Sequence, residues 1–142
     1  MNPTVNDSIV ETSLFENIIN NNAYVKNCGY VSRVIMVDGE LVAVPESYFK
    51  MFAYLLAKAT TDITYPVVTY ISQEANNVLR PFVHSPQHTA NALLQGLIAL
   101  GLVEGDTQTQ YKRSITVKLP SVVNTEEIAG QTMLVIKTRE HE

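Results

Sequence analysis

The segment from His84 to Gly105, HSPQHTANALLQGLIALGLVEG, constrains the fold more than any other part of the chain. Ser85 is a favourable N-cap and Pro86 suits the first position of a helix, so we expect a helix to begin here. Gly101 supplies the left-handed residue that commonly ends a helix, and the apolar pair after it is typical of the start of a strand. The sequence therefore predicts a helix over 85–100 that leads directly into a strand.

The two faces of this predicted helix differ in chemistry. At about 100° per residue, the apolar side chains gather on one side of the helix. The residues on that side are Ala90, Leu93, Leu94, Leu97 and Leu100. The opposite side carries His88, Asn91 and Gln95 beside the small Ala92. A helix that only fills a core does not need such a polar side, so we interpret it as a contact surface.

The segments before this helix predict a mixture of helices and strands. Helical spacing of apolar residues indicates a helix over about 8–19 that packs on the core or joins two subunits. The Asp38-Gly39 pair, flanked by β-branched residues, predicts a β-hairpin over 31–44. A helix is expected after Pro45, with one apolar stripe along it. The stripe consists of Phe49, Phe52, Ala53, Leu56 and Ala59, while Lys50, Tyr54 and Lys58 lie off it.

Further elements follow from the same patterns. Val67–Ile71 is expected to be a short strand, and Ser72 is expected to cap a short helix after it. A second strand, in which apolar residues alternate up to Leu119, returns after the polar turn GDTQTQ. The segment from Thr125 predicts a short turn or helix, and then a strand over Thr132–Thr138 that can pair with the 31–44 hairpin.

The order helix, short strand, helix, turn, helix and β-hairpin resembles the winged helix-turn-helix superfamily of DNA-binding proteins. The resemblance covers about residues 44–120, and its most specific part is SPQHTANALLQGLIALGLVE. The matching positions are Ser85, Thr89, Leu93, Leu97 and Gly101-Leu102-Val103-Glu104. The resemblance implies an α+β fold with a winged helix-turn-helix core, a recognition helix over 85–100 and a wing over 102–119. The segment VAVPESYFKMFAYLL also looks like the start of some phage and plasmid replication proteins.

We expect one domain over 1–142. Its winged-helix core spans about 44–120, the N-terminal helix and extra hairpin span 1–43, and a C-terminal extension with one strand spans 121–142. The C-terminal extension is not needed by a simple winged helix, so it suits dimerisation or a link to a further domain.

Candidate DNA contacts lie on the predicted recognition helix and the wing. Amide side chains such as Asn91 and Gln95 can bond the N6 and N7 edge of adenine. Residues at the start of the helix approach phosphates or base edges. Lys112-Arg113 is the only adjacent basic pair in the chain and is expected to contact phosphates. The full candidate set is Ser85, Gln87, His88, Asn91, Gln95, Lys112 and Arg113. The alternative is a solvated polar face and ordinary surface charge.

The charge of the chain limits how it can bind DNA. A net charge of −4 has the wrong sign for a protein that coats nucleic acid indiscriminately. No arginine or lysine lies between Arg80 and Lys112, so affinity per monomer should be modest. A homodimer on a two-fold site would double the contacts.

Two functions follow from this resemblance. The first is sequence-specific binding of double-stranded DNA by a transcription regulator, or by a replication initiator or organiser of a phage or plasmid. Replication or transcription proteins are then possible partners. The alternative is a winged-helix module that binds protein and not DNA, which the broad apolar face and the acidic balance also fit.

Other chemistries are not indicated. Cys28 is the single cysteine, so no internal disulfide can form and a reducing cytoplasm is expected. The start of the chain does not read as a signal peptide, and the longest apolar stretch is too short to span a membrane. His84 and His88 have a metal-like spacing, but the predicted helix begins between them and no cysteine or carboxylate accompanies them. We therefore expect no enzymatic activity, no bound metal ion and no cofactor.

Overall fold

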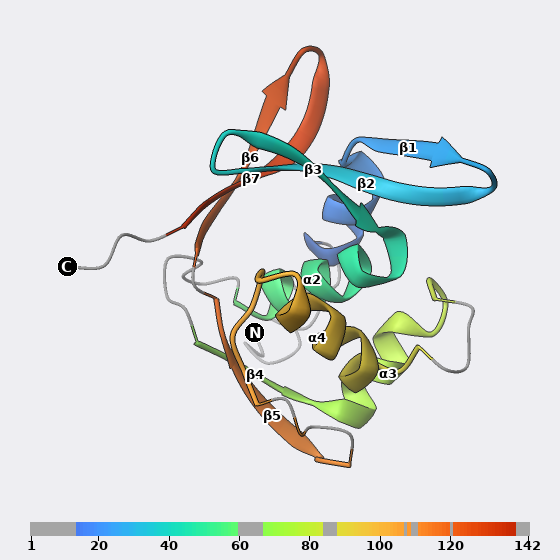
Figure 1. The fold of residues 1–142 in the computed structure, drawn as a ribbon. Coiled ribbons are helices and arrows are strands. Elements are labelled where there is room, and N and C mark those ends of the chain that lie inside the picture. Colours follow the sequence, from blue (N-terminus) through green and yellow to red (C-terminus); the bar gives the residue numbers. More distant parts are fainter. Residues whose placement is uncertain are drawn as a thin grey trace, which may run out of the picture.

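The computed structural model describes residues 14–59, 67–83, 88–106, 108, 111–119 and 121–138. The fold is α+β, with helices packed between a five-stranded sheet and a two-stranded sheet (Figure 1). After a helical segment at 14–21, the elements are β1 (Tyr24–Asn27), β2 (Tyr30–Val37), β3 (Glu40–Pro45), α2 (Glu46–Lys58), β4 (Val67–Ile71), α3 (Ser72–Leu79), α4 (Ala90–Ala99), β5 (Ser114–Lys118), β6 (Ser121–Ile128) and β7 (Gln131–Thr138).

Two-residue turns build the larger sheet. The predicted Asp38-Gly39 hairpin is confirmed, and both of its turn residues have positive φ, 50° and 88°. The same geometry joins β1 to β2 at Cys28-Gly29 and β6 to β7 at Ala129-Gly130. Such paired left-handed residues match the twist of antiparallel strands. The short helix considered for the segment from Thr125 is wrong, because these residues continue strand β6.

The final strand closes this sheet. β7 pairs antiparallel with β6 along its other edge and parallel with β2, where Met36 lies opposite Val135. The expected pairing of the final strand with the β2–β3 hairpin is therefore confirmed. The resulting order is β1-β2-β7-β6, with β3 also paired to β2.

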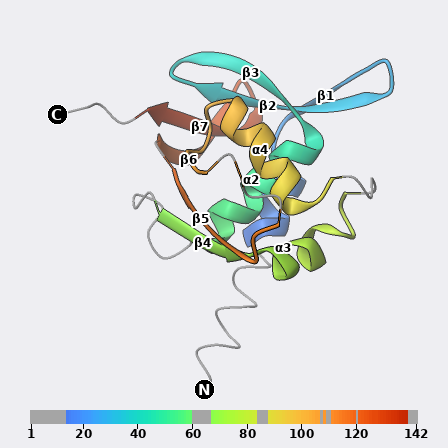
Figure 2. The same cartoon turned by 60° about the horizontal axis from the view of Figure 1, so that its bottom comes forward.

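Helix α2 is the centre of the core. It contacts β2 and β3 on one side and β4, α3 and α4 on the other, as the second view shows (Figure 2). Its predicted start after Pro45 is confirmed, but burial extends beyond a single stripe. Tyr54, expected off the stripe, is only 6% exposed, and Met51 and Leu55 are fully buried. The sequence pattern missed this because the helix is covered by elements on both sides.

The smaller sheet and the short helix α3 also confirm their predicted positions. Val68 and Tyr70 of β4 face the core with Ile115 and Val117 of β5, as the alternation predicts. The expected cap is wrong: α3 begins at Ser72 itself, and Ile71 holds the N-cap position with no side-chain cap. The Ser72 hydroxyl is used elsewhere.

Helix α4 begins later than the sequence predicts. Thr89 is its N-cap, and the Thr89 side chain accepts a hydrogen bond of 3.2 Å from the amide of Ala92. The expected start at Ser85-Pro86 is therefore wrong, and residues 84–87 lie outside the described residues. The end is as expected, because Gly101 follows the helix with φ 79°. The strand expected directly after it is wrong: Leu102 and Val103 form no strand, and Glu104 makes only an isolated bridge with Lys118.

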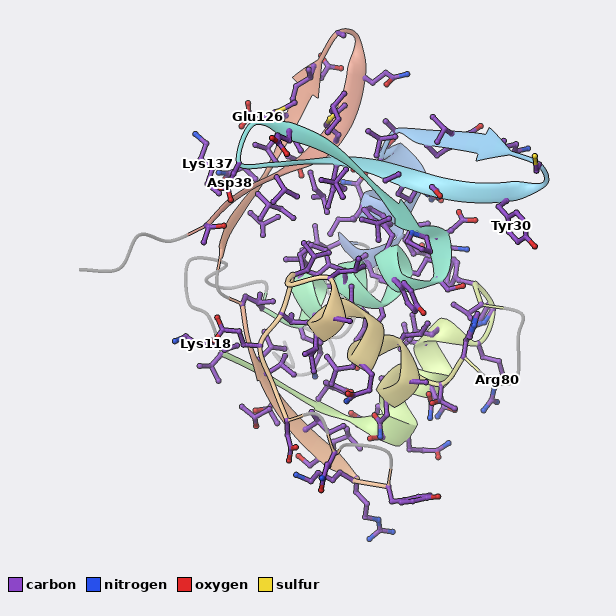
Figure 3. The ribbon with its side chains drawn as sticks, in the orientation of Figure 1. Tyr30, Asp38, Arg80, Lys118, Glu126 and Lys137 are labelled. Carbon is purple, nitrogen blue, oxygen red and sulfur yellow. The ribbon has the colours of Figure 1, made fainter. Side chains whose placement is uncertain are left out.

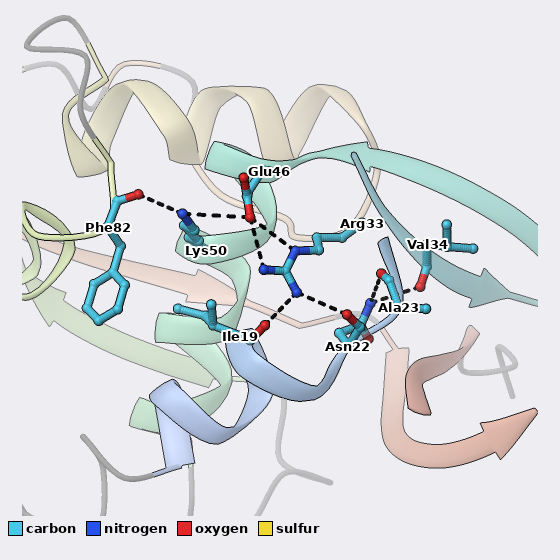
Figure 4. A network of polar contacts seen from close by, with 8 residues as sticks. All are labelled: Ile19, Asn22, Ala23, Arg33, Val34, Glu46, Lys50 and Phe82. Atoms are coloured by element: carbon cyan, nitrogen blue, oxygen red, sulfur yellow. Dashed lines mark hydrogen bonds and ion pairs between the residues drawn. The ribbon is translucent and has the colours of Figure 1, made fainter. Parts of the chain in front are cut away.

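A buried arginine joins the N-terminal helical segment to α2 (Figure 4). Arg33 is 8% exposed, and its guanidinium donates to the Ile19 carbonyl and to the Glu46 carboxylate, the latter at 2.9 Å. Phe15 and Ile19 are buried, which confirms the core-packing role predicted for the 8–19 helix. The part of that helix before residue 14 lies outside the described residues.

Candidate nucleic-acid interface

The apolar side of α4 lies in the core as predicted. Ala90, Leu93, Leu94 and Leu97 are each no more than 1% exposed. Leu100, assigned to the same side, is 45% exposed because the helix ends before it. The four buried residues therefore place this side of α4 in the core.

Asn91 does not face solvent. Its side chain is buried, and its Oδ1 atom accepts hydrogen bonds from the Tyr70 hydroxyl and the Ser72 hydroxyl, both at 3.0 Å. Its Nδ2 atom donates to the Lys112 carbonyl at 3.3 Å. The expectation that Asn91 lies on an open polar face is wrong, because β4 and the segment before β5 close over that side of α4. We assign Asn91 a structural role.

Burial also fixes the protonation of the group beside Asn91. Desolvation raises the pKa of Tyr70 above its usual range. The hydroxyl therefore remains protonated at physiological pH and serves as a hydrogen-bond donor. A buried amide that receives such bonds satisfies polar groups that would otherwise be costly to bury.

Gln95, one turn further along α4, also contacts the segment before β5. It is half-buried, and its Nε2 atom donates to the Asp106 carbonyl at 3.3 Å. The two amides predicted to read bases therefore both hold the connection between α4 and β5. Both amides lie on one side of α4 because both contact the segment before β5.

The exposed side of α4 is narrow and uncharged. Within the described residues it comprises His88, Thr89, Ala92, Ala99 and Leu100. Gly96 lies on the same side and is half-covered by Tyr48 of α2. Of the remaining candidates, Ser85 and Gln87 lie outside the described residues, and His88 is exposed just before the helix.

The two basic residues of the predicted wing differ in their pairing. The Lys112 ammonium lies 2.6 Å from the Asp106 carboxylate, and both side chains are about half exposed. The hydrogen bond from Lys112, with another from the Gln108 amide, lowers the pKa of Asp106. Arg113 is exposed and forms no ion pair with any described residue. Arg113 is thus the more available cation.

The backbone of the pair is anchored to the start of α3. The Ser72 hydroxyl donates to the Lys112 carbonyl at 2.7 Å, and the Ser72 amide donates to the Arg113 carbonyl at 2.9 Å. Sequence reasoning missed Ser72 as part of this site because it treated the residue as a helix cap. The available signal was a serine directly after strand β4. The partner strand of β4, β5, is directly preceded by the basic pair.

These contacts leave a shallow groove at the N-terminus of α3. The groove has a volume of about 530 Å³. Its lining consists of Ile71, Ser72, Gln73, Asn76, Lys112, Arg113 and Ser114. The N-terminus of a helix carries a partial positive charge, so it and the two cations favour an anionic group here. Glu74 is in the same turn of α3 but does not line the groove.

The N-terminus of α4 is closed by contrast. The Asn76 side chain accepts a hydrogen bond of 2.7 Å from the Ala90 amide, and Thr89 accepts from the Ala92 amide. Two amides that a phosphate would need are already used. The Ser72 amide at the start of α3 is likewise bonded, to the Arg113 carbonyl, so what favours an anion at α3 is the Lys112 and Arg113 side chains that line its groove.

The other cations within the described residues are not gathered into one surface. Arg80 and Lys118 lie at opposite sides of the helical half of the molecule (Figure 3). Lys50 is half-buried and donates to the Phe82 carbonyl at 2.7 Å, and burial lowers its pKa. Any electrostatic attraction to DNA would therefore come mainly from the α3 groove.

The chain matches no protein-family model, no curated protein sequence and no solved structure. No described helix has both the length and the apolar character needed to cross a membrane. Among the described residues, no three His, Cys, Asp or Glu side chains gather in a way that could hold a metal ion.

Proposed function

We propose that the chain binds double-stranded DNA, with the groove at the N-terminus of α3 as its phosphate contact. The observation that carries the proposal is the anchoring of Lys112-Arg113 at that helix terminus through Ser72. Hydrogen bonds to their backbone carbonyls hold Lys112 and Arg113 beside a helix N-terminus, and this arrangement suits an anion. Phosphate contacts of this kind supply most of the affinity of proteins for DNA.

The order of the elements supports the proposal. From α2 to β5 the chain runs helix, strand, helix, helix and strand, and β5 pairs with β4 and bridges to Glu104. This order matches the one expected of a winged helix-turn-helix core up to the wing, where an isolated Glu104–Lys118 bridge stands in place of the expected β-hairpin. In that interpretation α4 is the recognition helix, and its exposed residues are His88, Thr89 and Ala92 instead of Asn91 and Gln95.

The biological role that fits such binding is regulation of transcription, or initiation or organisation of replication of a phage or plasmid. One phosphate groove per chain favours a homodimer on a two-fold site, which would double the contacts. The site of action is then the cytoplasm.

Salt-dependent binding tests this function. Fluorescence anisotropy with a random-sequence duplex, at about 50 and 200 mM salt, should show binding that weakens steeply with salt. The double variant Lys112→Ala, Arg113→Ala should bind more weakly, and its slope of log affinity against log salt should be smaller by up to about two.

A matched variant controls for net charge. Lys26→Ala, Lys137→Ala removes the same charge from exposed positions on the larger sheet. Its slope should remain close to that of the wild type. Equal losses in the two double variants would mean that the α3 groove is not the contact.

A second candidate function is protein binding through α4. The observation in its favour is the uncharged exposed side of the helix, which ends in the 45% exposed Leu100. Absence of any DNA binding at about 50 mM salt would favour this function over the first.

A further inference from the structure

A second cavity lies between the N-terminal helical segment and the β6–β7 hairpin. Its volume is about 290 Å³, and it shares no residue with the α3 groove. Small-molecule sites in proteins begin at about 300 Å³, so this space suits a molecule of one substituted ring.

The interior of the cavity is aliphatic. Leu56, Val123 and Leu134 line it and are 3–4% exposed, so they form its base. Leu14 and Ile18 are half-buried and form its helical wall. Such a surface stabilises an apolar ring by removing it from water.

The rest of the lining is polar but carries no charge. Asn124 and Thr125 are exposed and Thr132 is half-buried, and no described residue hydrogen-bonds to these three side chains. Asn17, Asn21 and Asn22 complete the lining. Amide and hydroxyl groups at the mouth of an apolar space can orient a ligand that both donates and accepts hydrogen bonds.

One wall is rigid. The Asn22 side chain donates to the carbonyls of Ala23 and Val34 and accepts from the Leu134 amide, at 2.8–2.9 Å. These bonds connect the helical segment to β2 and β7, so the cavity does not depend on loose side chains. A preformed site binds without the cost of ordering its walls.

We propose that this cavity binds a small neutral ligand, one ring in size, that carries a carboxamide or a similar donor-acceptor group. The aliphatic base takes the ring, and the Thr125 and Thr132 side chains, which share a face of the sheet with Val123 and Leu134, take the polar group. A charged ligand is disfavoured, because the cavity offers no counter-charge and burial of an unpaired charge is costly.

Titration with benzamide tests the proposal. In methyl NMR spectra of the full chain, benzamide should cause saturable shifts at Ile18, Leu56, Val123 and Leu134. The methyl groups of Leu97, in the core of α4, should not shift. Benzoate has the same ring with a negative charge and should bind at least about tenfold more weakly. Equal binding of benzamide and benzoate, or benzamide shifts that do not saturate, would overturn the proposal.

Two variants sharpen the result. Thr125→Ala, Thr132→Ala should weaken benzamide binding about three- to tenfold, as expected for lost hydrogen bonds. Asn77→Ala, at an exposed asparagine of α3, should leave it unchanged. Ile18→Phe fills the cavity and should abolish binding, with thermal unfolding used to confirm that the variant is folded. Wild-type affinity in a folded Ile18→Phe variant, or in Thr125→Ala, Thr132→Ala, would contradict the site.

Discussion

The carboxamide of Asn91 and the hydroxyl of Tyr70 are joined by a buried hydrogen bond of 3.0 Å. The Ser72 hydroxyl lies 3.0 Å from the same Asn91 oxygen and 2.7 Å from the Lys112 carbonyl, and it shares its single proton between these two acceptors. The core of α4 is thereby connected to the basic pair at the α3 groove. Stability and the proposed DNA contact are linked through one asparagine.

Asn91→Ala should therefore destabilise the fold. The change leaves the Tyr70 hydroxyl without its partner in a buried position, which typically costs about 1–3 kcal/mol. Urea denaturation should show a lower midpoint than the wild type. Asn77→Ala, at an exposed position, is the control and should change the free energy of unfolding by less than about 0.5 kcal/mol. A fully stable Asn91→Ala protein would refute the structural role.

Asp106→Asn should strengthen DNA binding. The wild-type carboxylate pairs with Lys112 at 2.6 Å, so it competes with phosphate for that cation. Removal of the negative charge should raise affinity about three- to tenfold at low salt and increase the salt slope by about one. Asparagine retains a side-chain oxygen for the Gln108 amide. The comparison variant Glu127→Gln removes a carboxylate from β6 and should have little effect.

The Asp38 carboxyl should titrate below its usual range. It accepts hydrogen bonds from the Thr138 hydroxyl and amide, at 2.7 and 2.8 Å, and these lower its pKa. A lowered pKa means that its contribution to stability is present above the ordinary carboxyl pKa and is lost as pH falls through the lowered value. Carboxyl NMR titration should show this, and Thr138→Val should return the Asp38 pKa toward about 3.9. An Asp38 pKa that does not respond to Thr138→Val would contradict the assignment.

The effect of Gly96→Ala should change sign with its neighbour. A β-carbon at Gly96 would lie 2.7 Å from the ring of Tyr48, so the ring must move. Overpacking of this kind costs about 1–3 kcal/mol, while alanine in place of glycine gains about 1 kcal/mol of helix propensity. We expect Gly96→Ala to destabilise the wild type and to stabilise a Tyr48→Ala background. The four proteins of this cycle can be compared by urea denaturation.

Local signals in the sequence predicted much of the fold. Asp38-Gly39 identified its hairpin because two residues of positive φ are a local requirement, and Gly101 marked the end of α4 for the same reason. The alternation of buried and exposed side chains in β4 and β5 could also be predicted from the sequence. For the segment from Thr125 the sequence predicted a short turn or helix, and strand β6 with its hairpin at Ala129-Gly130 was missed because alanine is unusual at positive φ.

The candidate site was less predictable, because it depends on contacts between distant segments. A helical wheel placed Asn91 opposite the leucines, but it cannot show that β4 and the segment before β5 cover that side. Ser72 and Arg113 are separated along the chain and meet only through the pairing of β4 with β5. The pairing of Lys112 with Asp106 also follows from the turn between them and not from composition.

The parallel pairing of β7 with β2 has a consequence for how the chain folds. Between these strands lies the whole stretch from α2 to β5, and the bond from Thr138 to Asp38 closes a loop of 100 residues. Such closure loses much chain entropy before any contact compensates, and non-local pairing is slow. The hairpins and helices can form early from neighbouring residues, and β1 and β3 already pair with most of β2, so only Met36 and Val37 are left to pair late with β7. Until then β7 is paired with β6 alone, and its other edge exposes an incompletely folded chain to aggregation.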